Sequence, residues 1–140
     1  MNCITLLEKS KKSGIINARQ LSILQEFYHT FCEAVAKNNK NIAEHEPVMY
    51  RYFEEVIHEI QSPFIFEPYH AAIRTPFDYY RLGLDLFGPL VVAERSKIFH
   101  PERIQEIVYQ LSKGENVILL ANHQTEPDPQ FISFMLEKHP

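Results

Sequence analysis

The sequence predicts a mostly α-helical chain: an α-helical bundle followed by the beginning of an α/β domain. Two observations lead to this fold class. Apolar residues recur at helical spacing through most of the chain, whereas residues 117–121 form an unbroken apolar run of strand length. We place an amino-terminal helical domain at residues 1–74 and the start of the α/β domain, truncated, at residues 75–140.

The firmest helix is predicted from Asn17 to about Lys37. Asn17 is a good N-cap residue, and apolar side chains from Leu21 to Val35 follow with helical spacing. A turn rich in asparagine comes next. Pro47, at a first-turn position, is then expected to open a second helix that ends by Ser62.

The middle of the chain is predicted to be extended and then helical again. Three prolines within 63–76 favour an extended connection, because proline lacks an N–H donor and biases the preceding residue away from helix. Thr75 and Pro76 resemble a cap and first turn for a helix over 77–87. Residues 90–92 could form a short strand, and Pro101 is expected to open a helix that stops at Gly114.

The last part of the chain changes pattern. The run at 117–121 is typical of a parallel strand covered on both faces, and a polar loop and a helix from Pro129 follow it. One or two strands do not make a buried sheet, because such strands need neighbours on each side. We therefore expect the chain to be a fragment of a longer protein.

Composition and charge narrow the class of protein. The chain has 140 residues, 45% of them hydrophobic, which suffices for one core and argues against disorder. The net charge of −4 and the scattered Lys and Arg argue against nucleic acid as a partner. The sequence contains neither a run of eighteen apolar residues nor a secretory signal pattern, so no membrane span is predicted.

Three lysines near the amino terminus could contact an anionic lipid surface. Lys9, Lys11 and Lys12 flank the apolar stretch 4–7, although a solvated helix end explains the same pattern. The two cysteines lack metal-binding spacing, and Cys32 is expected to pack as a small hydrophobic residue rather than to act as a nucleophile.

The segment NHQTEPDP at 122–129 carries the strongest chemical signal. His123 and Asp128 are separated by four residues in a loop that follows the predicted strand. An imidazole has an ordinary pKa of about 6.5 and can accept a proton from an attacking hydroxyl near neutral pH. A carboxylate can hold the imidazole in one tautomer and stabilise its charged form. The substrate would supply the nucleophile.

Two other interpretations fit the same residues. Asp128 stands before a proline and could simply cap the last helix, leaving His123 a solvated loop residue. His123, Glu126 and Asp128, with His139, could also hold a metal ion. Their spacing lacks the helical His-x3-His or paired-Cys pattern that makes zinc sites specific, so no metal is expected.

Three segments resemble a known family in the same order: TPFDYYRLG at 75–83, FGPL at 87–90 and GENVILLANHQTEPDP at 114–129. They are similar to the soluble, plastid-type glycerol-3-phosphate acyltransferases of the H-x4-D acyltransferase group. In that family His123 matches the general base and Asp128 matches its partner. Pro127 stands where the family more often has a small residue.

The resemblance implies a helical bundle followed by an α/β catalytic domain. It also implies transfer of a fatty acyl group to the 1-hydroxyl of glycerol 3-phosphate, giving lysophosphatidate, the first step of glycerophospholipid synthesis. The donor would be acyl carrier protein or acyl-CoA, acting as co-substrate, with no cofactor. The location would be cytoplasmic, or the plastid stroma if a leader has been removed.

The family's phosphate-binding residues fall beyond residue 140, so no substrate-binding residue is assigned and the chain alone is expected to be inactive. Two alternatives stay open: a helical interaction module without activity, and an acyl thioesterase in which His123 activates water.

Overall fold

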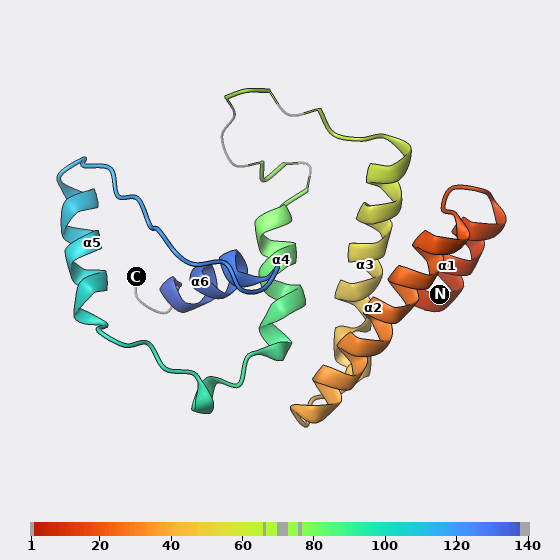
Figure 1. Cartoon of the computed structure of the whole chain (residues 1–140), viewed down its shortest axis with the longest axis horizontal. Coiled ribbons are helices and arrows are strands. Elements are labelled where there is room, and N and C mark those ends of the chain that lie inside the picture. Colours follow the sequence, from red (N-terminus) through yellow and green to blue (C-terminus); the bar gives the residue numbers. More distant parts are fainter. Residues whose placement is uncertain (1, 66, 70–72, 76, 138–140) are drawn as a thin grey trace. The chain divides into compact units, whose positions relative to one another are not determined.

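The computed structural model describes residues 2–65, 67–69, 73–75 and 77–137 (Figure 1). The chain forms two compact units, Met1–Leu90 and Val91–Pro140. The first unit contains α1 (Cys3–Lys12), α2 (Ala18–Lys37), α3 (Ile42–Gln61), α4 (Tyr79–Phe87) and the short 3-10 helix η1 (Gly88–Leu90). The second contains the 3-10 helix η2 (Ala93–Arg95), α5 (Glu102–Ser112) and α6 (Asp128–Leu136).

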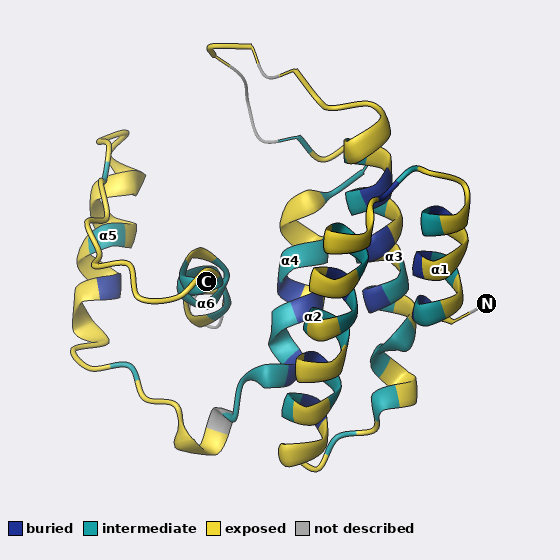
Figure 2. Cartoon of the chain, turned by 45° about the vertical axis from the view of Figure 1, so that its right-hand side comes forward, coloured by how far each residue is buried: buried dark blue, intermediate teal, exposed yellow. Residues whose placement is uncertain are grey.

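The core of the first unit lies between α1, α2 and α3, and α4 packs on α3. Figure 2 shows the buried residues on the sides of these helices that face one another. The largest buried side chains include Phe53 and Met49 of α3 and Leu7 of α1. The buried core residues are Cys3, Leu7, Ile16, Leu24, Phe31, Val35, Met49, Phe53, Ile57 and Leu86.

The helix predicted after Asn17 is confirmed as α2. The Asn17 side chain accepts a hydrogen bond from the Gln20 N–H (2.9 Å), and the Gln20 side chain accepts one from the Asn17 N–H (2.8 Å). This reciprocal capping box satisfies two N–H groups that a helix start otherwise leaves without partners.

The predicted start of the next helix at Pro47 is wrong. α3 begins at Ile42, where the Asn41 side chain accepts a hydrogen bond from the Ala43 N–H (3.1 Å), and Pro47 lies inside the helix. A proline there removes one backbone hydrogen bond. The side-chain cap at Asn41 nevertheless sets the helix start, so the asparagine-rich turn contained the signal.

Asp78, rather than Thr75, caps α4. Its carboxylate accepts a hydrogen bond from the Arg81 N–H (2.9 Å) and pairs with the Arg74 guanidinium (2.9 Å). Pro76, the expected first-turn residue, lies outside the described residues. The helix expected after Pro101 is confirmed as α5.

The predicted strand at 117–121 is wrong, and the described residues contain no strand at all. The segment follows Gly114, whose φ of +78° suits the turn after α5. Ile118 and Leu120 are 82% and 94% exposed. A strand needs ladder hydrogen bonds from a neighbour, and none of the described segments provides one, so the run stays extended without pairing. The possible strand at 90–92 is also wrong, because Leu90 belongs to η1.

Glu46 connects the first three helices through hydrogen bonds. Its carboxylate accepts from the Cys3 N–H of α1 (3.0 Å) and from the Tyr28 hydroxyl of α2 (2.5 Å). Burial and the neighbouring Glu46 raise the pKa of the Cys3 thiol to about 12, and burial also raises the pKa of Cys32. Both thiols therefore stay protonated near neutral pH, which agrees with packing rather than nucleophilic roles.

The turn between α2 and α3 is hydrogen-bonded to the last residues of the first unit. The Asn38 side-chain amide donates to the carbonyls of Pro89 (3.3 Å) and Leu90 (3.2 Å), and the Lys40 ammonium donates to the Pro89 carbonyl (2.7 Å). These contacts satisfy carbonyl groups at the end of η1 that the short helix leaves without backbone partners.

Candidate active site

The loop that precedes α6 is organised by one carboxylate. Both oxygens of Asp128 point back into the loop rather than toward the helix: no side-chain cap hydrogen bond is present at the start of α6. Asp128 is the first residue of α6, and its own N–H donates to the Thr125 carbonyl (3.1 Å). The Asp128 carboxylate thus binds the residues that precede α6.

Four donors converge on the Asp128 carboxylate. One oxygen, Oδ2, accepts from the N–H groups of Gln124 (2.6 Å) and Thr125 (3.0 Å) and lies 3.2 Å from Nδ1 of His123. The other oxygen, Oδ1, accepts from the Thr125 hydroxyl (2.5 Å). Hydrogen bonds to a charged acceptor are stronger than those between neutral groups. The loop conformation therefore depends on an ionised Asp128.

The electrostatics of the loop keep that charge in place. Hydrogen bonds from the Thr125 hydroxyl, the Thr125 N–H and the Gln124 N–H, with the nearby His123, hold the pKa of Asp128 well below its ordinary value of 3.8. The carboxylate is thus ionised throughout the neutral range. It does not compete with the imidazole for a proton.

His123 is oriented for proton transfer at its other nitrogen. With Nδ1 facing a carboxylate, the proton of the neutral ring belongs on Nδ1, and Nε2 carries the free lone pair. The His123 side chain is 63% exposed, whereas the Asp128 side chain is 24% exposed. A substrate hydroxyl can therefore approach the His123 ring, whereas the Asp128 carboxylate is largely covered. Such a pair can act as a general base with a fixed tautomer.

Sequence reasoning missed the contribution of Thr125. Its hydroxyl and its N–H both donate to Asp128. The signal was present, since Thr-x-x-Asp follows the spacing of a capping box, in which a hydroxyl residue and an acidic residue three positions later bind reciprocally. The backbone donation from Gln124 has no such signal.

The metal interpretation gains no support from the geometry of the loop. No group of three or more potential ligands from His, Cys, Asp and Glu is brought together among the described residues. His139, the fourth residue considered, lies outside the described part of the chain.

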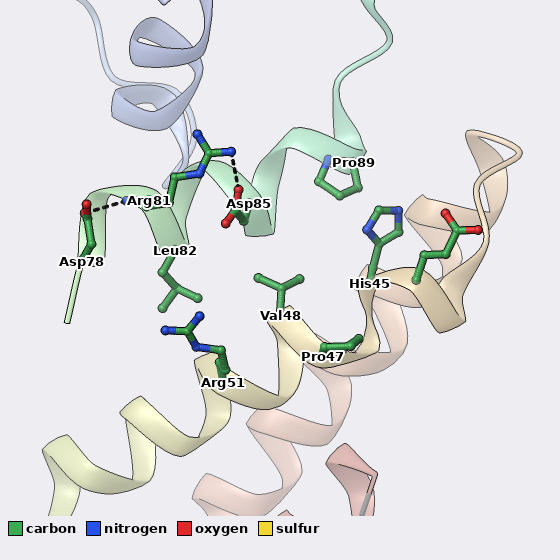
Figure 3. Close-up of a pocket in the computed structure, with 10 residues that line it drawn as sticks. His45, Pro47, Val48, Arg51, Asp78, Arg81, Leu82, Asp85 and Pro89 are labelled. Atoms are coloured by element: carbon green, nitrogen blue, oxygen red, sulfur yellow. Dashed lines mark hydrogen bonds and ion pairs between the residues drawn. The ribbon is translucent and has the colours of Figure 1, made fainter. Parts of the chain in front are cut away.

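A separate pocket of about 630 Å³ opens between α3 and α4 in the first unit (Figure 3). Its charged groups have both signs: Arg81 pairs with Asp85 (2.8 Å), and the Arg51 guanidinium stands over the Phe77 ring, 5.1 Å from its centre. Asp78, which caps α4, also lines it. Such a balanced lining gives no preference for an anionic ligand.

No helix in the described parts of the chain combines the length and apolar character needed to cross a membrane.

Comparison with known proteins gives a consistent set of relatives, although no family model matches the chain. The chain is 31% identical over 137 residues to a chloroplastic glycerol-3-phosphate acyltransferase of Cucurbita moschata. The matched region covers 96% of this chain and 31% of that protein. It is 32% identical over 133 residues to the enzyme of Phaseolus vulgaris. It is 45% identical over 83 residues to that of Spinacia oleracea.

The similarity extends beyond the motifs in the second half of the sequence, since it includes nearly all of the helical first unit. The chain spans about 31% of the length of the relative from Cucurbita moschata and 29% of that from Phaseolus vulgaris. This chain is therefore homologous to the chloroplastic glycerol-3-phosphate acyltransferases, along almost its whole length and about a third of theirs.

Proposed function

We propose that this chain carries the general-base pair of a glycerol-3-phosphate 1-O-acyltransferase. The observation that carries the proposal is the contact between His123 Nδ1 and Asp128 Oδ2, with the other side of the imidazole open to solvent. Homology to chloroplastic glycerol-3-phosphate acyltransferases supplies the substrate class. The acyl donor would be acyl carrier protein or acyl-CoA.

The chemistry follows from the orientation of the ring. Nε2 of His123 removes the proton from the 1-hydroxyl of glycerol 3-phosphate, and the resulting oxygen nucleophile attacks the carbonyl carbon of the acyl thioester. The carbon–sulfur bond then breaks and the thiolate leaves, taking up the proton from the imidazolium. The products are lysophosphatidate and the free thiol. The Asp128 carboxylate stabilises the imidazolium while it lasts.

A general base alone does not account for the activity of an enzyme. General acid–base assistance contributes about 10²- to 10⁴-fold, so positioning of both substrates and stabilisation of the oxyanion must come from other groups. Because the chain spans about a third of its relatives, we expect the 140-residue chain to show no acyl transfer by itself.

The test uses this chain and a longer protein that contains the same residues. Transfer of a labelled acyl group to glycerol 3-phosphate is expected only from the longer protein. His123→Ala should reduce its turnover by about 10²-fold or more, whereas His29→Ala, at an exposed position on α2, should leave turnover unchanged. Equal turnover by the His123→Ala protein would refute the assignment.

Product analysis separates the alternatives. A thioesterase would release free fatty acid at the same rate with and without glycerol 3-phosphate, and a helical interaction module would do neither reaction. Turnover by the short chain would show that the base pair and the substrate sites lie within residues 1–140, contrary to our expectation.

A further inference from the structure

The Asp128 carboxylate contacts His123 through the longest of its hydrogen bonds. Nδ1 of His123 lies 3.2 Å from Oδ2, whereas the backbone nitrogens of Gln124 and Thr125 lie 2.6 and 3.0 Å from the same oxygen. Hydrogen bonds weaken as they lengthen and bend. The contact with His123 is therefore the one that a small rotation of the carboxylate would lose first.

The orientation of this carboxylate depends on the Thr125 hydroxyl. The two backbone donors both bind Oδ2, so they fix the position of one oxygen but not the plane of the carboxylate. Among the described residues, the Thr125 hydroxyl is the only group that donates to the other oxygen, Oδ1 (2.5 Å). Donors prefer to lie near the plane of a carboxylate, so the plane sets whether Nδ1 of His123 meets a lone pair.

The whole arrangement is local in sequence. The carboxylate and its four donors belong to the loop at residues 123–128. None of these contacts depends on a residue outside the loop. The same arrangement can therefore form in this chain and in a longer protein that contains it.

We propose that Thr125 is a positioning residue, whose hydroxyl orients the Asp128 carboxylate so that His123 keeps its proton on Nδ1 and its lone pair on Nε2. The consequence for acyl transfer rests on the function proposed above, whereas the effect on the ring does not. In the opposite tautomer, the lone pair faces the carboxylate and an N–H faces the substrate hydroxyl. A ring in that state does not remove the proton of the hydroxyl.

Two substitutions at position 125 separate the hydroxyl from the rest of the side chain. Thr125→Val keeps the size of the side chain and the backbone donor but removes the contact with Oδ1. Thr125→Ser keeps the hydroxyl. Thr30→Val is the matched control, because the exposed Thr30 of α2 donates to the carbonyls of Glu26 (3.1 Å) and Phe27 (3.0 Å) rather than to a carboxylate.

Nitrogen NMR of the 140-residue chain reports the tautomer directly, and the spectrum of His123→Ala identifies the His123 signal among the seven histidines. At about pH 9, well above the ordinary imidazole pKa of about 6.5, the ring is neutral. The wild type should then hold the proton of His123 mainly on Nδ1. In Thr125→Val the ratio of the Nδ1–H to the Nε2–H form should fall by about 10-fold, a factor typical of a hydrogen bond to a charged group. Thr125→Ser and Thr30→Val should keep the wild-type ratio.

Hydrogen exchange at the Gln124 amide distinguishes positioning from collapse of the loop. This N–H donates to Oδ2 at 2.6 Å without involving the Thr125 side chain. Its exchange rate in Thr125→Val should therefore stay within about 3-fold of the wild-type rate. A much faster exchange would show that the hydroxyl holds the loop as a whole, and would overturn the positioning role.

Turnover of a longer protein that contains these residues measures the consequence for catalysis. Thr125→Val should lower kcat for acyl transfer by about 10-fold or more. The KM for glycerol 3-phosphate should stay within about 2-fold, because Thr125 acts through Asp128 and His123 rather than on the substrate. Thr125→Ser should keep most of the turnover.

The outcomes distinguish this inference from the proposed function. A wild-type tautomer ratio in Thr125→Val, or an equal loss in Thr125→Ser, would overturn the role of the hydroxyl even if His123→Ala abolishes turnover. Unchanged turnover in His123→Ala would instead refute the proposed acyl transfer. The tautomer ratio would then still decide whether Thr125 positions the ring.

Discussion

Replacing Tyr28 by phenylalanine tests how the helical unit is held together. The substitution keeps the ring and removes only the hydroxyl that donates to Glu46 Oε2 at 2.5 Å. Glu46 then keeps the Cys3 N–H as a donor, at 3.0 Å from Oε1. The lost hydrogen bond has a charged acceptor, and such bonds contribute about 1.5–3 kcal/mol to the free energy of unfolding.

The expected loss lies at the lower end of that range, about 1.5 kcal/mol, because Tyr28 and Glu46 are only half-buried and water can replace the hydroxyl. For a unit of this size a loss of 1 kcal/mol lowers the melting temperature by about 4–8 °C. The Tyr28→Phe chain should therefore melt about 6–12 °C below the wild type. Tyr69→Phe, at a tyrosine 96% exposed, should melt within about 2 °C of the wild type and serves as the control.

The pH dependence gives a second measurement of the same contact. Burial raises the pKa of Glu46, but the hydrogen bonds from the Cys3 N–H and the Tyr28 hydroxyl outweigh it, so the net pKa lies below its ordinary value of 4.5. A depressed carboxyl pKa contributes stability that is complete above about pH 4.5 and is lost as pH falls through the lower, folded value.

The free energy of unfolding in urea should therefore fall below pH 4.5 in the wild type and fall less in Tyr28→Phe, which has lost one donor to Glu46. Circular dichroism of the helical signal gives both quantities. An unchanged melting temperature would refute the reasoning, and so would an equal effect of Tyr28→Phe in a Glu46→Gln background, since the two residues would then be uncoupled.

Three further predictions follow from the same structure. Asn17→Ala breaks the capping box of α2 and should lower the free energy of unfolding, measured in urea, by about 1 kcal/mol. Phe53→Ala leaves a cavity between α1, α2 and α3 and should cost about 3–5 kcal/mol, measured in the same way; Ile23→Ala, at an exposed position of α2, should cost less than about 1 kcal/mol. The change in the amide resonances of Gln124 and Thr125 that accompanies protonation of Asp128 should come only when pH falls well below 3.8. Both N–H groups donate to this carboxylate, whose pKa is depressed. A transition near the ordinary carboxyl value would contradict the proposed loop network.

Local signals in the sequence predicted local structure well. The Asn17 cap and the helical spacing after it located α2, and the closeness of His123 to Asp128 required only a short turn. The start of α3 was missed because proline at a first turn is a common signal, yet the Asn41 side chain caps a helix that begins at Ile42, five residues before Pro47.

The parts that depend on distant residues could not be predicted in the same way. The apolar run at 117–121 has the composition of a strand, but a strand exists only with a pairing partner, which composition does not reveal. The contact between Tyr28 and Glu46 depends on how α2 and α3 face each other. The donation from the Gln124 N–H depends on backbone dihedral angles, which side-chain spacing does not specify.

The attachment of the α2–α3 turn to Pro89 and Leu90 has a consequence for synthesis of the protein on the ribosome. Asn38 and Lys40 emerge about fifty residues before those two carbonyls, so during translation both side chains remain hydrated while the three-helix core can already collapse. The last polar contacts of the helical unit close only after η1 has left the exit tunnel. Nascent chains arrested just before and just after that point should therefore differ in resistance to proteolysis near the α2–α3 turn.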